Sequence, residues 1–417
     1  MTAPLPLEKS QRLVSLDAYR GFVMLAMASA GLGLLNLSRD GAVVSQFDGT
    51  SGETAWHGLW KILGYQLEHV PWVGCSVWDL IQPSFMFMVG VAMPFSYARR
   101  RADGHTPAQN VAHVLIRSLV LVALGIFLRS KSSTQTNFTF EDVLTQIGLA
   151  YPIVYLTLGW GWRVQLAAAG LILLGDWVLF VQHPLPGSDF DSTTVGVPHD
   201  WPWLTGLGAQ WNKNTNFAAW FDQWFLNLFP RAEAFAFNRG GYQTLNFIPS
   251  AATMIFGVMA GEMLRGPLSL TQKGRRLALY GLLCLAIGMA VDGNIWPWVD
   301  WHWTLCPIVK RIWTPSWAVF STGWTLLILA AFYWLIDIRG YKAWAFPLVV
   351  VGMNSIAMYV MAGLMKGWIS SMLKIHIRPD LFTQAGHYAP LVEASCQLFV
   401  MWLICLWMYR QRIFVRI

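Results

Sequence analysis

The sequence predicts an all-α membrane protein, a polytopic transmembrane helical bundle of about ten spans with both termini in the cytoplasm. Three observations carry this prediction. Of the 417 residues, 55% are hydrophobic and only 12% are charged, which is about half the charged fraction of a soluble domain. The 24 tryptophans suit a membrane–water interface, where the indole ring is half buried and its N–H stays hydrated. Long apolar runs also recur along the chain.

The individual spans follow from the lengths of these runs. A helix needs about 20 apolar residues to cross a hydrocarbon core about 30 Å thick. The runs predict spans at 13–36, 77–98, 109–129, 143–161, 164–182, 246–264, 277–291, 317–336, 345–365 and 391–409. The run at 277–291 is the shortest of them. No internal repeat divides the sequence, so residues 1–417 are expected to form a single transmembrane domain.

The orientation follows from the distribution of positive charge. Lysine and arginine gather in alternate short connections, such as Arg99-Arg100-Arg101, whereas the other connections are longer and carry more Asp and Glu. The positive-inside rule places the short basic connections in the cytoplasm, and an even number of spans returns the C-terminus to that side. The net charge of +7 is therefore explained by membrane orientation, and no nucleic-acid partner is expected beside the lipid bilayer.

The cysteines predict neither a disulfide framework nor a metal site. The sequence has five cysteines without a CxxC pair. Cys284, Cys396 and Cys405 lie in apolar runs, where a thiol packs as a small hydrophobic group. No metal is expected.

Asp17 and Arg20 stand near the cytoplasmic start of the first span. A spacing of three places them on one helix face, where they can form an ion pair. Such a pair either anchors the helix end or presents Arg20 to an anionic ligand from the cytoplasm, with Asp17 holding the guanidinium in place. The spacing alone favours the anchor.

His69 ends the first outer connection, and Asp79 follows at the mouth of the second span. Imidazole is the usual proton-transfer group near neutral pH, and either Glu68 or Asp79 could orient the ring. A loop histidine is more often incidental, and the chain has nine histidines.

Uncharged polar residues lie at or within other spans, namely Asn246, Asn354 and Ser355. Such side chains often form hydrogen bonds between helices, worth about 1 kcal/mol or less each, so a structural role is the simpler interpretation. Tryptophans crowd the outer connection at 296–303, where they suit either an interfacial aromatic belt or the apolar face of a sugar ring.

Several of these segments, in this order, resemble the heparan-α-glucosaminide N-acetyltransferase family of transmembrane acyltransferases. The similar segments are 12–21 (RLVSLDAYRG), 69–74 (HVPWVG), 79–85 (DLIQPSF), 143–151 (VLTQIGLAY), 257–261 (GVMAG), 310–314 (KRIWT) and 352–356 (GMNSI). Each motif alone is weak, but together they extend from about residue 12 to 365 in the order of the family.

The resemblance implies an acetyl-CoA-dependent transmembrane acetyltransferase. Such enzymes deliver acetyl from cytoplasmic acetyl-CoA to an amino sugar or another glycan acceptor across the membrane, with a loop histidine at the reacting centre. That histidine corresponds to His69, with Asp79 as its catalytic partner. Arg20 with Asp17 would bind the CoA phosphates, and Asn354 with Ser355 would line the path of the cofactor.

The resemblance leaves other features open. His69 could act as a general base or accept the acetyl group itself, and both N- and O-acetylation remain possible outcomes. The animal enzymes carry Asn where Gly31 stands here, which leaves the acceptor open. The chain lacks their large N-terminal luminal region, which predicts a bacterial inner-membrane relative. A homodimer is compatible with the family.

Two other classes of protein compete with the enzyme. A transporter or channel for a sugar or another small polar solute would also use polar residues and Gly/Pro-broken helices within spans, but no matching pair of broken segments appears in two halves. A non-catalytic membrane scaffold would make His69 merely structural.

Overall fold

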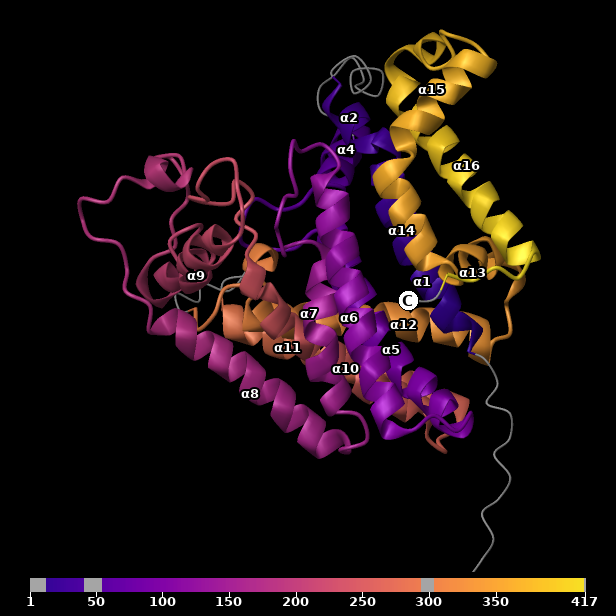
Figure 1. Ribbon diagram of the computed structural model, residues 1–417, viewed down its shortest axis with the longest axis horizontal. Helices are drawn as coiled ribbons and strands as arrows, with labels where there is room; N and C mark the ends of the chain where they lie inside the picture. The colour runs from indigo at the N-terminus through magenta and orange to yellow at the C-terminus, as the bar shows by residue number, and fades with distance from the viewer. Residues whose placement is uncertain (1–12, 41–54, 294–303, 416–417) are drawn as a thin grey trace, which may run out of the picture.

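The computed structural model describes residues 13–40, 55–293 and 304–415 (Figure 1). These residues form an all-helical bundle, and within them the extended pairing is limited to one isolated bridge. The helices are α1 (Val14–Ser29), α2 (Leu34–Arg39), α4 (Ala55–Gln66), α5 (Ile81–Ala102), α6 (Pro107–Ser130), α7 (Val143–Leu156), α8 (Trp162–Val181), α9 (Phe217–Phe225), α10 (Phe247–Arg265), α11 (Leu270–Asp292), α12 (Pro315–Tyr333), α13 (Phe346–Gly352), α14 (Ser355–Leu364), α15 (Lys366–His376) and α16 (Ala389–Arg410).

The predicted all-α, multi-span membrane fold is confirmed, whereas the cytoplasmic position of both termini stays a prediction. Eight helical segments in the described ranges are long and apolar enough to cross a membrane, and a ninth span is possible if the bent pair α13 and α14 is counted. The predicted span at 143–161 corresponds to α7, which is apolar but has only 14 residues. The prediction at 277–291 was too short, because α11 begins at Leu270 with a capping box from Ser269 and continues for 23 residues.

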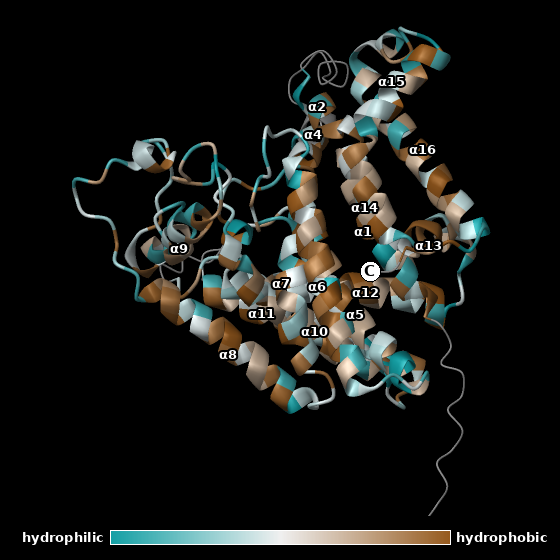
Figure 2. Ribbon diagram, in the orientation of Figure 1, coloured by the Kyte–Doolittle hydropathy of each residue, from teal (hydrophilic) through white to brown (hydrophobic). Residues whose placement is uncertain are grey.

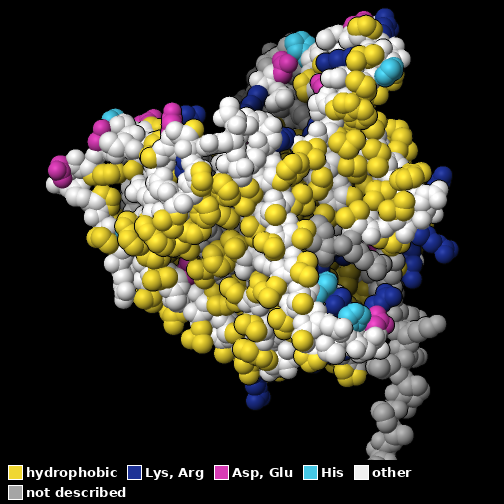
Figure 3. Space-filling view, in the orientation of Figure 1, with side chains coloured by type: hydrophobic (Ala, Val, Ile, Leu, Met, Phe, Trp, Pro, Cys, Tyr) yellow, Lys and Arg dark blue, Asp and Glu magenta, His cyan; other side chains and the backbone are white. Residues whose placement is uncertain are grey.

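The bundle has an inner and an outer set of helices. In the apolar windows of the segments containing α5 and α10, 67% of the residues are buried, compared with 17% in those of α6, α11 and α16. Hydrophobic residues, coloured brown, recur along the outer helices, including α8 and α16 (Figure 2). In the space-filling view, hydrophobic side chains occupy the middle of the surface, and most charged side chains lie toward its edges (Figure 3). This distribution is the one that a surrounding bilayer requires.

Glycines allow the inner helices to approach closely. A Cβ atom on Gly257 of α10 would lie 2.2 Å from the carbonyl oxygen of Phe87 in α5, and one on Gly90 would lie 2.0 Å from the oxygen of Met254. Gly261, one turn after Gly257, packs against Val91 in the same way. Small residues four apart drive helix packing in membranes because the backbones come into van der Waals contact.

The predicted span at 345–365 is broken in the middle. The axes of the Ala343–Gly352 and Ser355–Leu364 segments differ by 68°. Asn354, at the break, does not form an interhelical bond but holds the end of the chain, donating to the carbonyl of Ile413 at 3.1 Å and accepting from the N–H of Val415 at 3.0 Å. The polar pair in this span therefore marks a change of helix direction.

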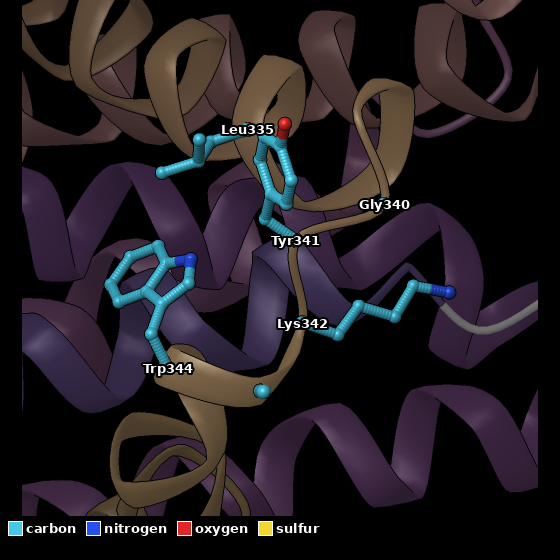
Figure 4. A pocket seen from close by; sticks show the side chains of 6 residues that line it. Leu335, Gly340, Tyr341, Lys342 and Trp344 are labelled. Carbon is cyan, nitrogen blue, oxygen red and sulfur yellow. The ribbon is translucent and has the colours of Figure 1, made fainter.

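An aromatic groove of about 610 Å³ lies where the chain turns from α12 toward α13. Tyr341 and Trp344 are exposed beside Leu335, and Lys342 extends away from Trp344 (Figure 4). Two exposed aromatic rings with a neighbouring lysine are typical of an anchor at the membrane–water interface.

Replacing Gly257 by Ala should destabilise the bundle. The new methyl group would collide with the backbone of α5, and overpacking of this kind costs about 1–3 kcal/mol. The matched control is Gly170→Ala on α8, where a Cβ meets nothing within 4 Å. We expect the midpoint of thermal unfolding in detergent to fall for Gly257→Ala only, and equal midpoints for the two variants would contradict the packing described here.

Candidate active site

Two loops that are far apart in the sequence meet at the candidate site, one between α4 and α5 and the other between α11 and α12. The N–H of Gly74 donates to the carbonyl of Ile308 at 2.9 Å. Val73 pairs with Val309 in the isolated antiparallel bridge. This short pairing brings the segment after His69 against the segment before Lys310.

Buried polar groups fix the second loop. Asp292, the last residue of α11, accepts a hydrogen bond from the N–H of Ile308 at 2.6 Å. Thr314 caps α12, and its hydroxyl also accepts from the N–H of Val309 at 3.0 Å and donates to the carbonyl of Pro307 at 2.7 Å. The loop before α12 is thus tied to the ends of both helices that flank it.

The Asp79 carboxylate organises the first loop. The residue is fully buried, and its Oδ1 atom lies 2.7 Å from Nδ1 of His69. Its Oδ2 atom accepts from the N–H of Val70 at 3.2 Å, the N–H of Ser76 at 3.1 Å and the hydroxyl of Ser76 at 3.0 Å. The structure therefore joins the predicted pair His69 and Asp79, whereas Glu68, the other candidate to orient the ring, pairs with Arg39.

Lys310 completes this group, and the sequence analysis gave it no role. Its Nζ atom lies 3.6 Å from Oδ1 of Asp79 and 3.2 Å from Nδ1 of His69, and its side chain is 5% exposed. The available signal was the KRIWT segment, which was noted only as part of the resemblance. Lysine is seldom buried without an anionic partner, and Asp79 supplies that partner here.

These contacts define the state of the imidazole. When Nδ1–H donates to the buried carboxylate of Asp79, the lone pair of neutral His69 is on Nε2. Burial lowers the pKa of His69 below its usual value, the Lys310 ammonium acts in the same direction, and Asp79 partly offsets both effects. The side chain is 37% exposed, so an acyl donor can approach a ring that is neutral at pH 7.

Tyr242 and Arg311 form a wall beside the lysine. The Lys310 Nζ atom lies 3.4 Å from the hydroxyl of Tyr242 and 5.3 Å from the centre of its ring. The Arg311 guanidinium lies 5.2 Å from the same ring and donates to the carbonyls of Val70 and Gly240 at 3.3 and 2.8 Å. Arg311 therefore fixes the backbone next to His69.

A layer of buried polar side chains continues from this wall. Thr244 receives a hydrogen bond from Gln146 at 3.1 Å and donates one to Asp222 at 2.9 Å, while Asn246 donates to the carbonyl of Arg311 at 2.8 Å. The unpaired atoms of this layer are Gln146 Oε1, Asp222 Oδ1, Asn246 Oδ1 and both amide atoms of Gln243. Buried polar atoms without a protein partner are commonly satisfied by ordered water.

The second predicted group forms separately. Arg20 donates to the hydroxyl of Ser355 at 3.3 Å, which brings the first span to the break between α13 and α14. The backbone of Asp17 packs against Gly352, whereas its predicted pairing with Arg20 stays a prediction. Asn354 stands next to Ser355 but holds residues 413 and 415 instead of lining this contact.

A tyrosine connects the two groups. The hydroxyl of Tyr19, the neighbour of Arg20, donates to Ser84 in α5 at 2.8 Å, and both side chains are buried. Ser84 follows Asp79 by about one and a half helical turns. The Arg20 side and the His69 side of the bundle are therefore close along α5.

Comparisons with known proteins give two relatives, whereas no family model matches the sequence. The heparan-alpha-glucosaminide N-acetyltransferase of Homo sapiens is 22% identical over 451 residues, an alignment that covers 97% of this chain and 60% of the human protein. The Mus musculus protein of the same name is 20% identical, covering 98% of this chain and 61% of its own length. The resemblance to this family is confirmed. The chain spans about three fifths of the length of these curated relatives.

The structure also places other residues of the sequence analysis. Gly31, the position at which a departure from the animal enzymes was expected, has a left-handed φ of 67°, and a Cβ there would lie 3.7 Å from Leu67 and 3.9 Å from Trp78. The departure therefore lies beside the loop that carries His69. The tryptophan run at 296–303 lies outside the described residues. In the described part of the chain, no group of three or more His, Cys, Asp or Glu is arranged to hold a metal ion.

Asp79 and Lys310 should stabilise the fold as a coupled pair. Removing one member of a buried ion pair costs about 3–5 kcal/mol because the other charge is left buried and uncompensated. We expect Asp79→Ala and Lys310→Met each to lower the unfolding midpoint strongly. In the double variant, the decrease in the midpoint should be smaller than the sum of the two single decreases. Additive losses in this double-mutant cycle would show that the two side chains do not interact.

Proposed function

We propose that this protein is a transmembrane acetyltransferase of a bacterial inner membrane, which moves acetyl from cytoplasmic acetyl-CoA to an amino sugar of a glycan on the outer face. The observation that carries the proposal is a neutral, accessible His69 held by a buried carboxylate and a buried ammonium within a helical membrane bundle. The similarity of almost the whole chain to two N-acetyltransferases supports the same reaction class.

The contacts of His69 suit acyl transfer. In the direct route, Nε2 removes a proton from the acceptor amine as its nitrogen attacks the thioester carbonyl, the C–S bond breaks, and the proton passes to the CoA thiolate. In the covalent route, Nε2 itself attacks the carbonyl, CoA leaves as the thiolate, and the amine then displaces the imidazole. Asp79 keeps Nδ1 protonated in both routes, so that Nε2 is the reacting atom.

Lys310 has a second role in this proposal. Negative charge develops on the thioester oxygen in either route, and a fixed ammonium in a water-poor site stabilises that charge. The same ammonium disfavours protonation of His69, which keeps the reactive lone pair available. A buried lysine beside the imidazole thus serves the electrophile and the nucleophile together.

The two substrates are assigned to different regions. Arg20 and Ser355 would bind the phosphates of CoA, and the link through Tyr19 and Ser84 brings that region near Asp79 along α5. The long pantetheine arm of CoA would extend from the Arg20–Ser355 contact toward Asp79 and His69. The acceptor sugar would approach the exposed part of the His69 ring, beside the wall formed by Tyr242 and Arg311.

The first test measures release of free CoA thiol by the purified protein in liposomes. Acetyl-CoA is supplied with and without glucosamine, galactosamine or chitobiose, and the product is examined for N-acetylation. We expect amino-sugar-dependent release that falls by at least about 100-fold in His69→Ala. His199→Ala, which changes an exposed outer-loop histidine, is the matched control and should keep wild-type activity.

The outcomes separate the function classes. Uptake of a labelled amino sugar without acetylation would replace the enzyme by the transporter. A folded protein that binds no acetyl-CoA and forms no product with any of these acceptors would refute the acetyltransferase. In an assay without acceptor, radiolabelled acetyl that stays bound to the wild type but not to His69→Ala would identify the covalent route.

The pH dependence should report the state of His69. Because burial and Lys310 lower its pKa, kcat/KM is expected to fall only as the pH drops below about 6.5, where the imidazole becomes protonated. Lys310→Met removes a charge that lowers this pKa, so the acid limb should move to higher pH as the maximal rate declines. A limb that stays in place would show that His69 is not the group that titrates.

A further inference from the structure

A second charged cavity lies away from the His69 loop. It has a volume of about 400 Å³ and is bounded by the end of α6, the start of α7, the α14–α15 junction and one residue of α1. Its polar lining consists of Arg129, Lys131, Ser132, Asp142, Tyr359 and Lys366, and its apolar lining includes Met27, Leu128 and Ala362. The proposed acetyl transfer uses none of these residues.

Three cations from the end of α6 and the start of α15 converge on this cavity. Arg129 lies in the last turn of α6, Lys131 is the residue after that helix, and Lys366 begins α15. Lys131 donates to the carbonyl of Gly363, which holds its ammonium at the cavity. Burial and the Lys131 ammonium together lower the pKa of Lys366, so the two lysines repel each other across the site. A bound anion would relieve this repulsion.

The two acidic residues nearby, Asp142 and Glu141, offset part but not all of the charge of the three cations. Asp142 lines the cavity, but its Oδ1 accepts from the N–H groups of Leu144 and Thr145 at 2.9 and 3.2 Å, and its Oδ2 accepts from the Thr145 hydroxyl at 2.7 Å. That carboxylate is therefore used as the cap of α7. Glu141, which attracts Arg129, is hydrogen-bonded to Thr139 and Asn238 at 2.9 Å each.

We propose that this cavity binds a phosphate ester. A tetrahedral dianion or diester accepts hydrogen bonds in several directions, which matches a guanidinium and two ammonium groups that approach from different elements. The Ser132 and Tyr359 hydroxyls supply further donors, and Met27, Leu128 and Ala362 accommodate an apolar portion of the same molecule. Basic pockets between transmembrane helices bind phospholipid head groups by this chemistry.

The surroundings of the cavity bear on the source of the phosphate. Phe127 and Trp368 are each 57% exposed and Leu364 is 42% exposed, and they lie on the same helices as the lining residues. This apolar surface would meet the acyl chains of a lipid. The cavity also lies between α1 and α14, the two helices that carry Arg20 and Ser355. Met27 follows Arg20 by about two turns, and Tyr359 follows Ser355 by about one turn. Because the proposed site for a soluble phosphate ester is on the same two helices, such an ester is the other possible source of the phosphate.

The test compares thermal unfolding in detergent before and after a phosphate compound is added. The wild type in phosphate-free detergent is compared with the same sample to which phosphatidylglycerol or inorganic phosphate is added. The variant is Lys131→Gln/Lys366→Gln, and the matched control is Lys374→Gln, an exposed lysine farther along α15 that does not line the cavity. Lys366→Arg, which keeps the positive charge, is the second variant.

We expect a phosphate source to raise the midpoint by about 3 °C or more in the wild type, in Lys374→Gln and in Lys366→Arg, but not in the double variant. An effect of phosphatidylglycerol alone identifies a lipid, whereas an effect of inorganic phosphate identifies a soluble phosphate compound. Equal shifts in the double variant and the wild type, or no shift with any source, would overturn the proposal. Because unfolding is the readout, this result is independent of acetyl transfer.

Discussion

The buried carboxylate of Asp79 is the constraint on which the candidate site depends. A charge without solvent must be neutralised and hydrogen-bonded, and Asp79 meets both demands through one loop and one distant lysine. The hydrogen bonds of Oδ2 shape the segment from Val70 to Ser76, while Oδ1 faces His69 and Lys310. The position of the imidazole is thus a consequence of how the carboxylate is satisfied.

The sequence alone was enough to predict those parts of the structure that depend on the composition of a single segment. Apolar length located the helices, including the α11 span that was predicted too short, because hydrophobic burial in a membrane needs no partner from elsewhere in the sequence. His69 and Asp79 were found because they are ten residues apart and lie on one loop and the helix that follows it.

Contacts between segments that are far apart in the sequence were harder to predict. Lys310 is 241 residues from His69, and nothing local distinguishes it from a basic loop residue until the bridge between Val73 and Val309 is known. The role of Asn354 was also hidden, because a polar residue in an apolar run can bond to a neighbouring helix or end the helix in which it lies. The structure shows the second alternative. The helix axis bends by 68° at this position, and Asn354 forms its hydrogen bonds with residues 413 and 415, which lie beyond the end of α16.

The division of the bundle has a consequence for how acetyl could cross the membrane. The glycine-packed pair α5 and α10 allows little change in separation, since each helix backbone already touches the other. Asp79 lies in the short 3-10 turn (Trp78–Leu80) that leads into α5, so His69, the proposed reacting group, is fixed to this rigid part. The Arg20–Ser355 contact instead joins α1 to a span that is bent by 68°, of which only the first half, α13, is packed closely on α1 through Gly21 and Gly352. Any rearrangement that admits a large donor is therefore expected in α14, beyond the bend, while His69 stays in place. Such an arrangement would let acetyl reach the outer face by transfer at one fixed imidazole, without a carrier that moves the whole thioester across the bilayer.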